Sequence, residues 1–271
     1  MPTRAHPSLS KTGARTMPEL PRAVEGPRGQ SLVIIPTYNE AENLGLLVSM
    51  IFTHGSFDVL VVDDNSPDGT GEVADKLTRR SKGRVAVLHR PGKLGLGTAY
   101  VQGFRYALET GYDRVFQMDA DFSHDPASLP SLWQALNQAD VVLGSRYVPG
   151  GATRNWSVFR RALSRVGSFY AATVLGVPFH DLTGGFKGFR RRALEALDLD
   201  GIRSNGYSFQ IEVTYRFHRL GFRIVEIPIT FEERRVGQSK MCMSIVAEAI
   251  LVPWELRLSQ PHLREVHPWT R

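Results

Sequence analysis

Continuous apolar runs alternate along this chain with mixed segments of helical length. Five runs have the length and the β-branched character of buried strands, at residues 31–36, 57–64, 84–89, 113–121 and 139–147. Helix-length segments separate or follow them, at residues 40–52, 70–80, 96–110 and 127–138. A strand-then-helix order that repeats in this way predicts an α/β domain, in which a parallel sheet is covered by helices on both faces.

The second half of the chain has a different pattern. Three segments predict a strand, a helix and a further strand that close the far side of the sheet, with some antiparallel pairing: residues 183–191, 206–221 and 222–235. We therefore expect one domain at 31–240, a disordered basic leader at 1–30 and a C-terminal helical tail at 241–271. The leader has five prolines and five lysines or arginines but no apolar core, so it does not predict a signal peptide.

Composition and charge narrow the class of protein. The 271 residues are 42% hydrophobic and 22% charged, as in an ordinary soluble globular protein. The formal net charge of +6 indicates an anionic partner, which could be a nucleic acid, a phosphorylated substrate or an anionic membrane surface. The single cysteine, Cys242, excludes an intrachain disulfide. Residues 241–258 are the most apolar stretch, but Glu248, Pro253 and Arg257 interrupt them, so no membrane-spanning helix is expected.

Polar clusters follow four of the five predicted strands. They read PTYNE (36–40), DDNSPDGT (63–70), DADFSHD (119–125) and GSRY (144–147). The carboxyl ends of parallel strands meet at one edge of the sheet, and sheets of this kind bind their ligands there. We therefore expect the four clusters to form one site.

Three carboxylates lie within seven positions after the fourth predicted strand. Asp119 and Asp121 are spaced so that both can bind one Mg²⁺ or Mn²⁺, with a substrate diphosphate completing the oxygen ligands. Asp125 precedes Pro126, which is typical of a helix start. The alternative is that Asp121 or Asp125 only caps the next helix. The position at a strand end favours a metal on Asp119 and Asp121, with Asp125 as the cap.

Two further features suit a nucleotide. Asp63 and Asp64 end the second strand, where an acid can bind a base or ribose, although the cluster is also rich in turn residues. We expect one of the two acids to serve the nucleotide. GKLGLGTAY (92–100) lacks a dinucleotide fingerprint, because Tyr100 stands where the third glycine would be. This segment predicts either a turn that brings Lys93 near a ligand or a loop without that role.

Basic residues gather in two places. Arg161 and Arg165 share one helical face, with Arg160 beside them, and an apolar stretch at 166–179 follows. This pattern is typical of a peripheral protein on an anionic membrane, or of a buried helix with a solvated basic end. ERRVGQSK (233–240) places cations around a glycine, which suits phosphate binding or a solvated charged loop.

Seven motifs, in this order and spacing, resemble the family-2 inverting glycosyltransferases of the GT-A fold: PTYNE, VVDDNSPDGT, MDADFSHDP, GSRY, TGGFKGFRR, GYSFQIE and ERRVGQSK. Within that family, residues 31–258 resemble the polyprenol (dolichol) monophosphate mannose synthases of the actinobacterial kind. The resemblance implies a Rossmann-like, mostly parallel sheet flanked by helices, with C-terminal amphipathic helices. It also implies inverting transfer of mannose from GDP-mannose to polyprenyl phosphate.

The resemblance assigns roles to residues of this chain. The guanosine half of GDP-mannose is expected on Pro36, Tyr38, Glu40, Val62 and Asp64. Asp119 and Asp121 are expected to hold the metal, with Ala120 against the sugar nucleotide. Some relatives use a glutamine as a further metal ligand where this chain has Ser123, so Ser123 or a water would take that place.

The resemblance also places the reacting phosphates. Arg146, Arg160 and Ser164 match positions for the acceptor phosphate and the sugar diphosphate, and with Asp121 they are the expected catalytic residues. Arg234 and Lys240 match a loop that closes over the phosphates.

The implied chemistry needs little help from a base. A lipid phosphate is already an anion at neutral pH, so the site has to align it and stabilise the departing GDP. His124 is then expected to be structural or to contact the substrate. We expect a peripheral protein at the cytoplasmic face of the membrane, resting on the bilayer or on an integral membrane partner, and no nucleic-acid partner. The alternatives are a UDP-glucose-dependent transferase and a non-catalytic relative that binds a sugar nucleotide.

Overall fold

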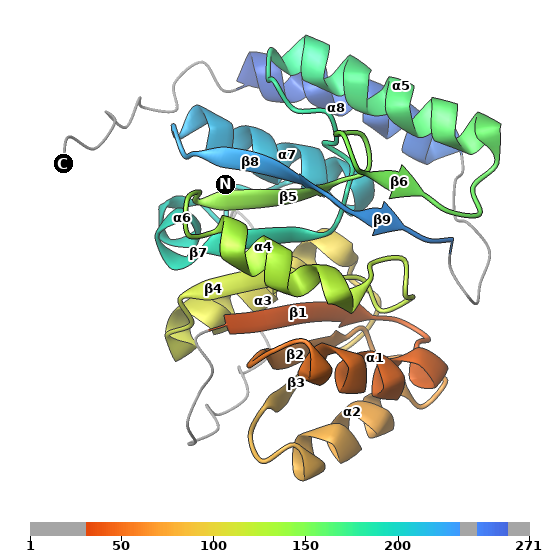
Figure 1. The fold of residues 1–271 in the computed structure, drawn as a ribbon, viewed down its shortest axis with the longest axis vertical. Coiled ribbons are helices and arrows are strands. Elements are labelled where there is room, and N and C mark those ends of the chain that lie inside the picture. The colour runs from red at the N-terminus through yellow and green to blue at the C-terminus, as the bar shows by residue number, and fades with distance from the viewer. Residues whose placement is uncertain (1–30, 234–242, 260–271) are drawn as a thin grey trace, which may run out of the picture.

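The computed structural model describes residues 31–233 and 243–259 (Figure 1). The leader and two expected phosphate ligands, Arg234 and Lys240, lie outside these residues, so their predicted roles stay predictions. No helix in the described part of the chain is both long and apolar enough to cross a bilayer.

A seven-stranded sheet forms the centre of the molecule, in the order β3-β2-β1-β4-β7-β5-β8. Its strands are β1 (Ser31–Thr37), β2 (Asp58–Asp63), β3 (Val85–His89), β4 (Arg114–Gln117), β5 (Val141–Ser145), β7 (Lys187–Arg190) and β8 (Ile224–Pro228). The first four are mutually parallel, and β8 pairs parallel with β5. Two short strands, β6 (Ala152–Thr153) and β9 (Thr230–Phe231), pair outside this sheet.

One strand lies where the sequence pattern did not place it. β8 closes the far side as expected, but β7 is inserted between β4 and β5 and runs antiparallel to both. A glycine permits this insertion: a Cβ at Gly188 would come within 2.9 Å of the Phe116 ring. The sheet is therefore mostly parallel, as expected, but it has one antiparallel strand near its middle.

Helices cover both faces of the sheet (Figure 1). They are α1 (Ala41–Thr53), α2 (Thr70–Arg80), α3 (Leu96–Thr110), α4 (Leu129–Ala135), α5 (Val158–Leu175), α6 (Arg191–Ala196), α7 (Gly206–Arg219) and α8 (Met243–Ser259), with a 3₁₀ turn at Pro126–Ser128 before α4. Alternate residues of β1 enter separate cores: Leu32 and Ile34 pack on one face, Val33 and Ile35 on the other. This two-sided burial explains the continuous apolar run.

The first residue of β7 is a lysine that is buried in the core. Lys187 is 1% exposed, and its Nζ donates to the Gln210 carbonyl at 2.7 Å and to Thr214 Oγ1 at 2.8 Å. Burial lowers the pKa of Lys187 to about 7, although the negative charge of Asp181 opposes this shift. The folded protein therefore releases this proton at a lower pH than the unfolded chain does.

This difference predicts a pH dependence of stability. Above pH 7 the unfolded chain still binds the Lys187 proton that the folded protein has lost, so the free energy of unfolding should rise with pH. One proton contributes at most about 1.4 kcal/mol per pH unit. Urea unfolding between pH 7 and 9.5 would measure the slope for the wild type and for Lys187→Met. We expect the wild type to gain stability relative to the variant as the pH rises; parallel curves would contradict the assignment.

Candidate active site

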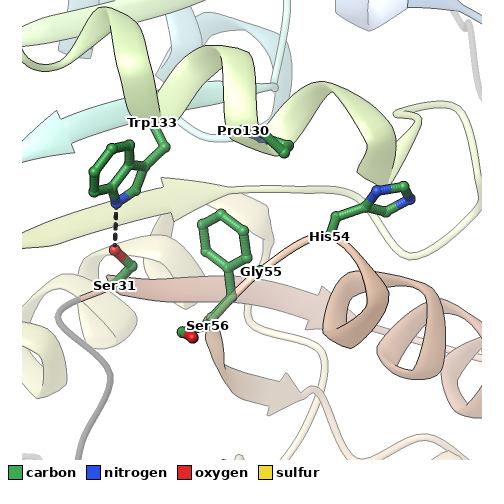
Figure 2. A pocket seen from close by; sticks show the side chains of 7 residues that line it. Ser31, His54, Gly55, Ser56, Pro130 and Trp133 are labelled. Carbon is green, nitrogen blue, oxygen red and sulfur yellow. Dashed lines mark hydrogen bonds between the residues drawn. The ribbon is translucent and has the colours of Figure 1, made fainter.

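The carboxyl ends of β1, β2, β4 and β5 lie along one edge of the sheet, as the sequence predicts. Because β7 is antiparallel, its amino end and the preceding Gly184 and Gly185 reach the same edge. A separate pocket lies at the opposite edge, where β1 begins: Trp133 and Phe57 line it, and Trp133 Nε1 donates to Ser31 Oγ at 3.1 Å (Figure 2). That pocket is remote from the four polar clusters.

The two acids at the end of β2 have different partners. Asp63 accepts hydrogen bonds from Thr37 Oγ1 at 2.9 Å and from Ser66 Oγ at 2.6 Å, so it joins the β1 and β2 ends. Asp64 accepts from the backbone N–H groups of Leu94 and Gly95 at 3.2 and 3.3 Å. Asp63 therefore serves the turn, while Asp64 ties the 92–95 loop to the strand.

A buried arginine supports the Asp64 carboxylate. Arg90 Nη1 lies 2.9 Å from Asp64 Oδ1, and the Arg90 side chain is fully buried. Burial raises the pKa of Asp64 above its usual value, and the charge of Arg90 opposes the rise. The same arginine donates to the Gly95 carbonyl, so one ion pair shapes the start of α3 and the loop that carries Lys93.

Lys93 lies over an aromatic ring at this corner. Its Nζ is 4.1 Å from the centroid of the ring of Tyr38, the residue that the resemblance assigns to the guanosine. Glu40 lies just before α1, where its carboxylate accepts from Asn43 Nδ2 at 2.8 Å. Pro36 is half-buried beside them. The side chain of Val62 is fully buried in the core on one face of the sheet.

The Asp-x-Asp pair lies in a tight loop after β4. Asp119 Oδ1 accepts from Tyr100 Oη at 3.3 Å, and its side chain is 30% exposed. Asp121 Oδ1 accepts from the Ser123 backbone N–H at 3.0 Å. Phe122 lies between Asp121 and Ser123 and has a φ of 61°. This left-handed conformation costs energy in a bulky residue. The backbone of the turn therefore holds the Asp121 carboxylate, while Tyr100 of α3 holds that of Asp119.

The residues around this pair suit a divalent metal. Gly185 faces Asp119: a Cβ there would lie 3.5 and 3.6 Å from the two carboxylate oxygens, within the space that a ligand of Asp119 needs. The buried hydroxyl of Ser123 has no hydrogen-bond partner among the described residues, so it remains available as an oxygen ligand. No group of three His, Cys, Asp or Glu in the described ranges could hold a metal alone. Two carboxylates with substrate oxygens match the ligands that Mg²⁺ and Mn²⁺ prefer.

His124 has a structural environment. It is fully buried, its Nδ1 accepts from the Asp119 backbone N–H at 3.1 Å, and its ring stacks on Phe186 at 5.0 Å. Burial lowers the pKa of His124, and the charges of Asp119 and Asp121 oppose the shift. The lone pair on Nδ1 is engaged, so this histidine orients the acidic loop and is not placed to abstract a proton from a substrate.

A buried ion pair holds the arginine that follows β5. Arg146 Nε and Nη2 donate to the two oxygens of Asp181 at 2.7 and 2.6 Å, and Nη2 also donates to Thr183 Oγ1 at 2.8 Å. Burial acts to raise the pKa of Asp181, but the charge and hydrogen bonds of Arg146 hold it below its usual value. Asp181 was not among the residues that the sequence pattern singled out.

The start of α5 adds a second arginine and a hydroxyl network. The Arg160 guanidinium lies 4.3 Å from the Trp156 ring centroid, and its Nη1 donates to Glu233 Oε1 at 2.8 Å. Tyr147 Oη donates to Ser164 Oγ at 2.7 Å. The sequence singled out Arg160 and Ser164 as candidates but neither aromatic residue, although NW (155–156) precedes the basic turn and Tyr147 belongs to GSRY.

Edge-on rings connect the acidic loop with the basic helix. His124 contacts the Phe231 ring at 5.4 Å, Phe231 contacts Trp156 at 5.2 Å, and Trp156 lies under Arg160. Phe231 also lies 5.3 Å from the Arg146 guanidinium. The carboxylate loop after β4 and the arginines around β5 and α5 are therefore packed together through these rings. Ala120 is buried beneath this site.

Solved structures with the same arrangement support the fold assignment. Glucosyl-3-phosphoglycerate synthase from Mycobacterium tuberculosis, in complex with Mn²⁺ and UDP, matches with a TM-score of 0.60 at 19% identity over 86% of this chain and 81% of that chain. The mannosyltransferase PcManGT from Pyrobaculum calidifontis, in complex with GDP-Man and Mn²⁺, matches with a TM-score of 0.54 at 19% identity over 86% and 71%. The chain has the GT-A fold.

Sequence relatives are closer. Residues 32–198 match the model of glycosyl transferase family 2. The undecaprenyl-phosphate mannosyltransferase of Micrococcus luteus is 52% identical over 81% of this chain and 90% of its own length. The polyprenol monophosphomannose synthase of Mycolicibacterium smegmatis is 48% identical over 85% and 89%. The chain therefore belongs to glycosyl transferase family 2 and, within it, to the polyprenol-phosphate mannosyltransferases.

Proposed function

We propose that the protein transfers mannose from GDP-mannose to a polyprenyl phosphate, with release of GDP and inversion to a β-linked polyprenyl monophosphomannose. The ring contacts between the Asp119–Asp121 loop and the Arg146–Arg160 region carry this proposal, because they join an acidic donor side to a basic acceptor side. The names of the two sequence relatives supply the sugar and the class of acceptor.

On the donor side, Asp119, Asp121 and Ser123 would hold Mg²⁺ or Mn²⁺. When bound, such an ion supplies positive charge that stabilises the departing diphosphate. Both structural neighbours contain Mn²⁺, and one also contains GDP-Man, which favours a metal and a guanosine nucleotide here. Tyr38 and Lys93 would meet the nucleotide, and the Asp64–Arg90 pair would keep their loop in position.

On the acceptor side, Arg146, Arg160 and Ser164 would orient the lipid phosphate. That phosphate is anionic at neutral pH, so no proton has to be removed before it attacks the anomeric carbon. Holding it in line with the leaving group converts a bimolecular encounter into a positioned displacement. A single displacement inverts the α linkage of the donor. Arg234 and Lys240 would add charge at the diphosphate.

The protein would work as a peripheral protein at the cytoplasmic face of a membrane, where the lipid acceptor is held. The test of the function is a transfer assay with radiolabelled GDP-mannose and polyprenyl phosphate, in the presence of Mg²⁺, Mn²⁺ or EDTA. We expect organic-soluble label that requires both the metal and the acceptor. Transfer from UDP-glucose instead would favour the alternative donor, and no transfer from either nucleotide by folded protein would favour a non-catalytic relative.

The Arg160–Glu233 ion pair leads to a prediction about the acceptor. Glu233 neutralises the arginine that would bind the lipid phosphate, so the phosphate has to compete with this carboxylate. In Glu233→Gln we expect half-saturation at a several-fold lower acceptor concentration, because an exposed ion pair is worth up to about 1 kcal/mol. Steady-state rates at varied acceptor concentration measure the effect.

A neighbouring pair provides the control. Glu232 forms a similar exposed contact at 3.3 Å with Arg154, an arginine that is not predicted to bind the phosphate. Glu232→Gln removes the same charge and should leave the half-saturating acceptor concentration unchanged. Equal effects of the two variants would mean that net charge, and not competition at Arg160, governs acceptor binding.

A further inference from the structure

Helix α5 turns an apolar side outward. Its exposed large apolar residues are Val158 (79%), Phe159 (77%), Val166 (63%) and Phe169 (72%). Its inward side carries Ser168, Ala171 and Val174, and Ser164 bonds to Tyr147. A surface helix of a soluble domain normally has apolar residues inward and polar residues in water, whereas α5 carries apolar residues on both sides. The outer side of α5 is therefore built for an apolar partner.

Helix α8 extends the same surface. Its exposed apolar residues are Ile250 (50%), Leu251 (58%), Trp254 (48%) and Leu258 (74%). Tyr170 of α5 joins the two helices, because its hydroxyl donates to the Ile250 carbonyl and accepts from Trp254 Nε1, both at 2.9 Å. Figure 1 shows α5 and α8 side by side at the top of the view, at one extreme of the molecule. We name these eight residues the α5–α8 apolar face.

Exposed apolar residues concentrate on this face. Among the described residues, only Leu46, Leu94 and Trp133 are large, apolar and exposed elsewhere, and they lie on separate elements. Single exposed apolar side chains are ordinary, but a contiguous group marks an interaction surface. The question is which partner covers it.

The charge around the face selects the partner. Residues 141–180 contain five arginines and no aspartate or glutamate. Two of these arginines, Arg161 and Arg165, are exposed on α5 among the apolar residues. Apolar side chains that enter acyl chains, with arginines at the level of the headgroups, are the pattern of a helix that lies in the plane of an anionic bilayer. Trp254 adds an indole, which favours the membrane–water boundary.

We infer that the α5–α8 apolar face rests directly on an anionic lipid bilayer, with both helices parallel to its surface. The consequence for catalysis rests on the proposed function. Helix α5 carries Arg160 and Ser164 near its amino end, so docking would bring these predicted phosphate ligands to the depth of the lipid phosphates. The acceptor would then enter the site without leaving the membrane.

Vesicle binding tests the inference without any substrate. Purified full-length protein is sedimented with vesicles of phosphatidylglycerol and phosphatidylcholine, or of phosphatidylcholine alone. We expect binding to the anionic vesicles and a loss of at least tenfold in Phe159→Ser/Phe169→Ser/Leu258→Ser. These three side chains are exposed by 77, 72 and 74%, so the variant should fold, which circular dichroism and thermal unfolding would verify. Leu46→Ser, on the outer side of α1, is the matched control and should bind like the wild type.

Charge variants refine the test. Arg161→Gln and Arg165→Gln should each weaken binding to anionic vesicles about fivefold, the effect of about 1 kcal/mol per cation near such a surface. High salt should reduce that difference. Triple-variant binding equal to the wild type would overturn the inference. So would a wild type that binds no vesicles, which would point to an integral membrane protein as the partner.

Two acceptors separate this inference from the proposed function. We expect the triple variant to transfer mannose normally to a water-soluble, short-chain isoprenyl phosphate but poorly to a long-chain polyprenyl phosphate embedded in vesicles. Equal loss with both acceptors would mean that the face acts on the site itself and would overturn membrane docking. A wild type that binds vesicles but transfers to neither acceptor would refute the proposed function and leave the docking face standing.

Discussion

Replacing Asp121 by asparagine is expected to reduce mannosyl transfer at least about a hundredfold while the protein stays folded. Asp121 is 5% exposed and bonds to the Ser123 backbone N–H, and asparagine can keep that hydrogen bond through its carbonyl oxygen. What asparagine loses is the negative charge that would hold a divalent cation. The initial rate at saturating Mg²⁺ or Mn²⁺ measures the loss, and the apparent metal affinity should fall with it.

Asp125→Asn is the matched control for this variant. Asp125 caps the turn before α4 by accepting from the Ala127 N–H at 2.9 Å, as the sequence predicts. Asparagine is an equally good cap, so stability and activity should both remain close to wild type. If both substitutions reduced the rate equally, the negative potential of the loop and not metal binding would explain the effect, and the metal assignment of Asp121 would fail.

The second large effect concerns stability. Asp181→Asn should lower the free energy of unfolding by about 3–5 kcal/mol, because it leaves the buried guanidinium of Arg146 without its counter-ion. Both side chains are at most 5% exposed, so little water reaches the guanidinium to compensate for the lost charge. The pKa of Asp181 is held below its usual value, so its contribution is present at neutral pH and is lost only in acid, below the pKa of an unfolded aspartate. Urea unfolding at pH 7 measures the difference.

A double variant separates the structural role of Arg146 from its role in transfer. Arg146→Gln/Asp181→Asn removes both charges but keeps groups that can hydrogen-bond, so it should regain part of the stability that Asp181→Asn loses. Its activity should stay low, because the proposed site needs a cation for the lipid phosphate. A stable double variant with wild-type transfer would show that Arg146 only supports the fold.

The order of helices and strands along the chain could be predicted from the local pattern of apolar and polar residues. The helices α2 and α3 begin and end at the expected residues, and the strands β1, β2 and β3 differ from their predicted bounds by a residue or so. The position of β7 does not follow, because strand order depends on which side chains pack across the sheet. Its antiparallel neighbours β4 and β5 are separated from it by about 70 and 40 residues of chain, and the close approach of Gly188 to Phe116 becomes visible only in the structure.

The edge of the sheet that carries the candidate site could be predicted from the sequence, but the contacts within that site could not. A strand end is visible in sequence, so the four polar clusters could be assigned to one edge. The pairs that position them are distant in sequence: Arg146 binds Asp181, Arg160 binds Glu233, and His124 supports Asp119 from within a ring stack. The partners of Asp64 could not be predicted for the same reason, because Arg90 and Leu94 reach it only when their loop folds back on the strand.

Isolation of the lipid product tests the central claim most directly. The wild type would be incubated with GDP-mannose, polyprenyl phosphate and Mn²⁺, and the anomeric configuration of the lipid-linked sugar would be determined by NMR. We predict mannose joined to the polyprenyl phosphate in the β configuration, formed only with the metal and absent with Asp121→Asn. An α-linked product would contradict the single displacement, and the absence of lipid-linked mannose from folded, vesicle-bound protein would contradict the proposed function.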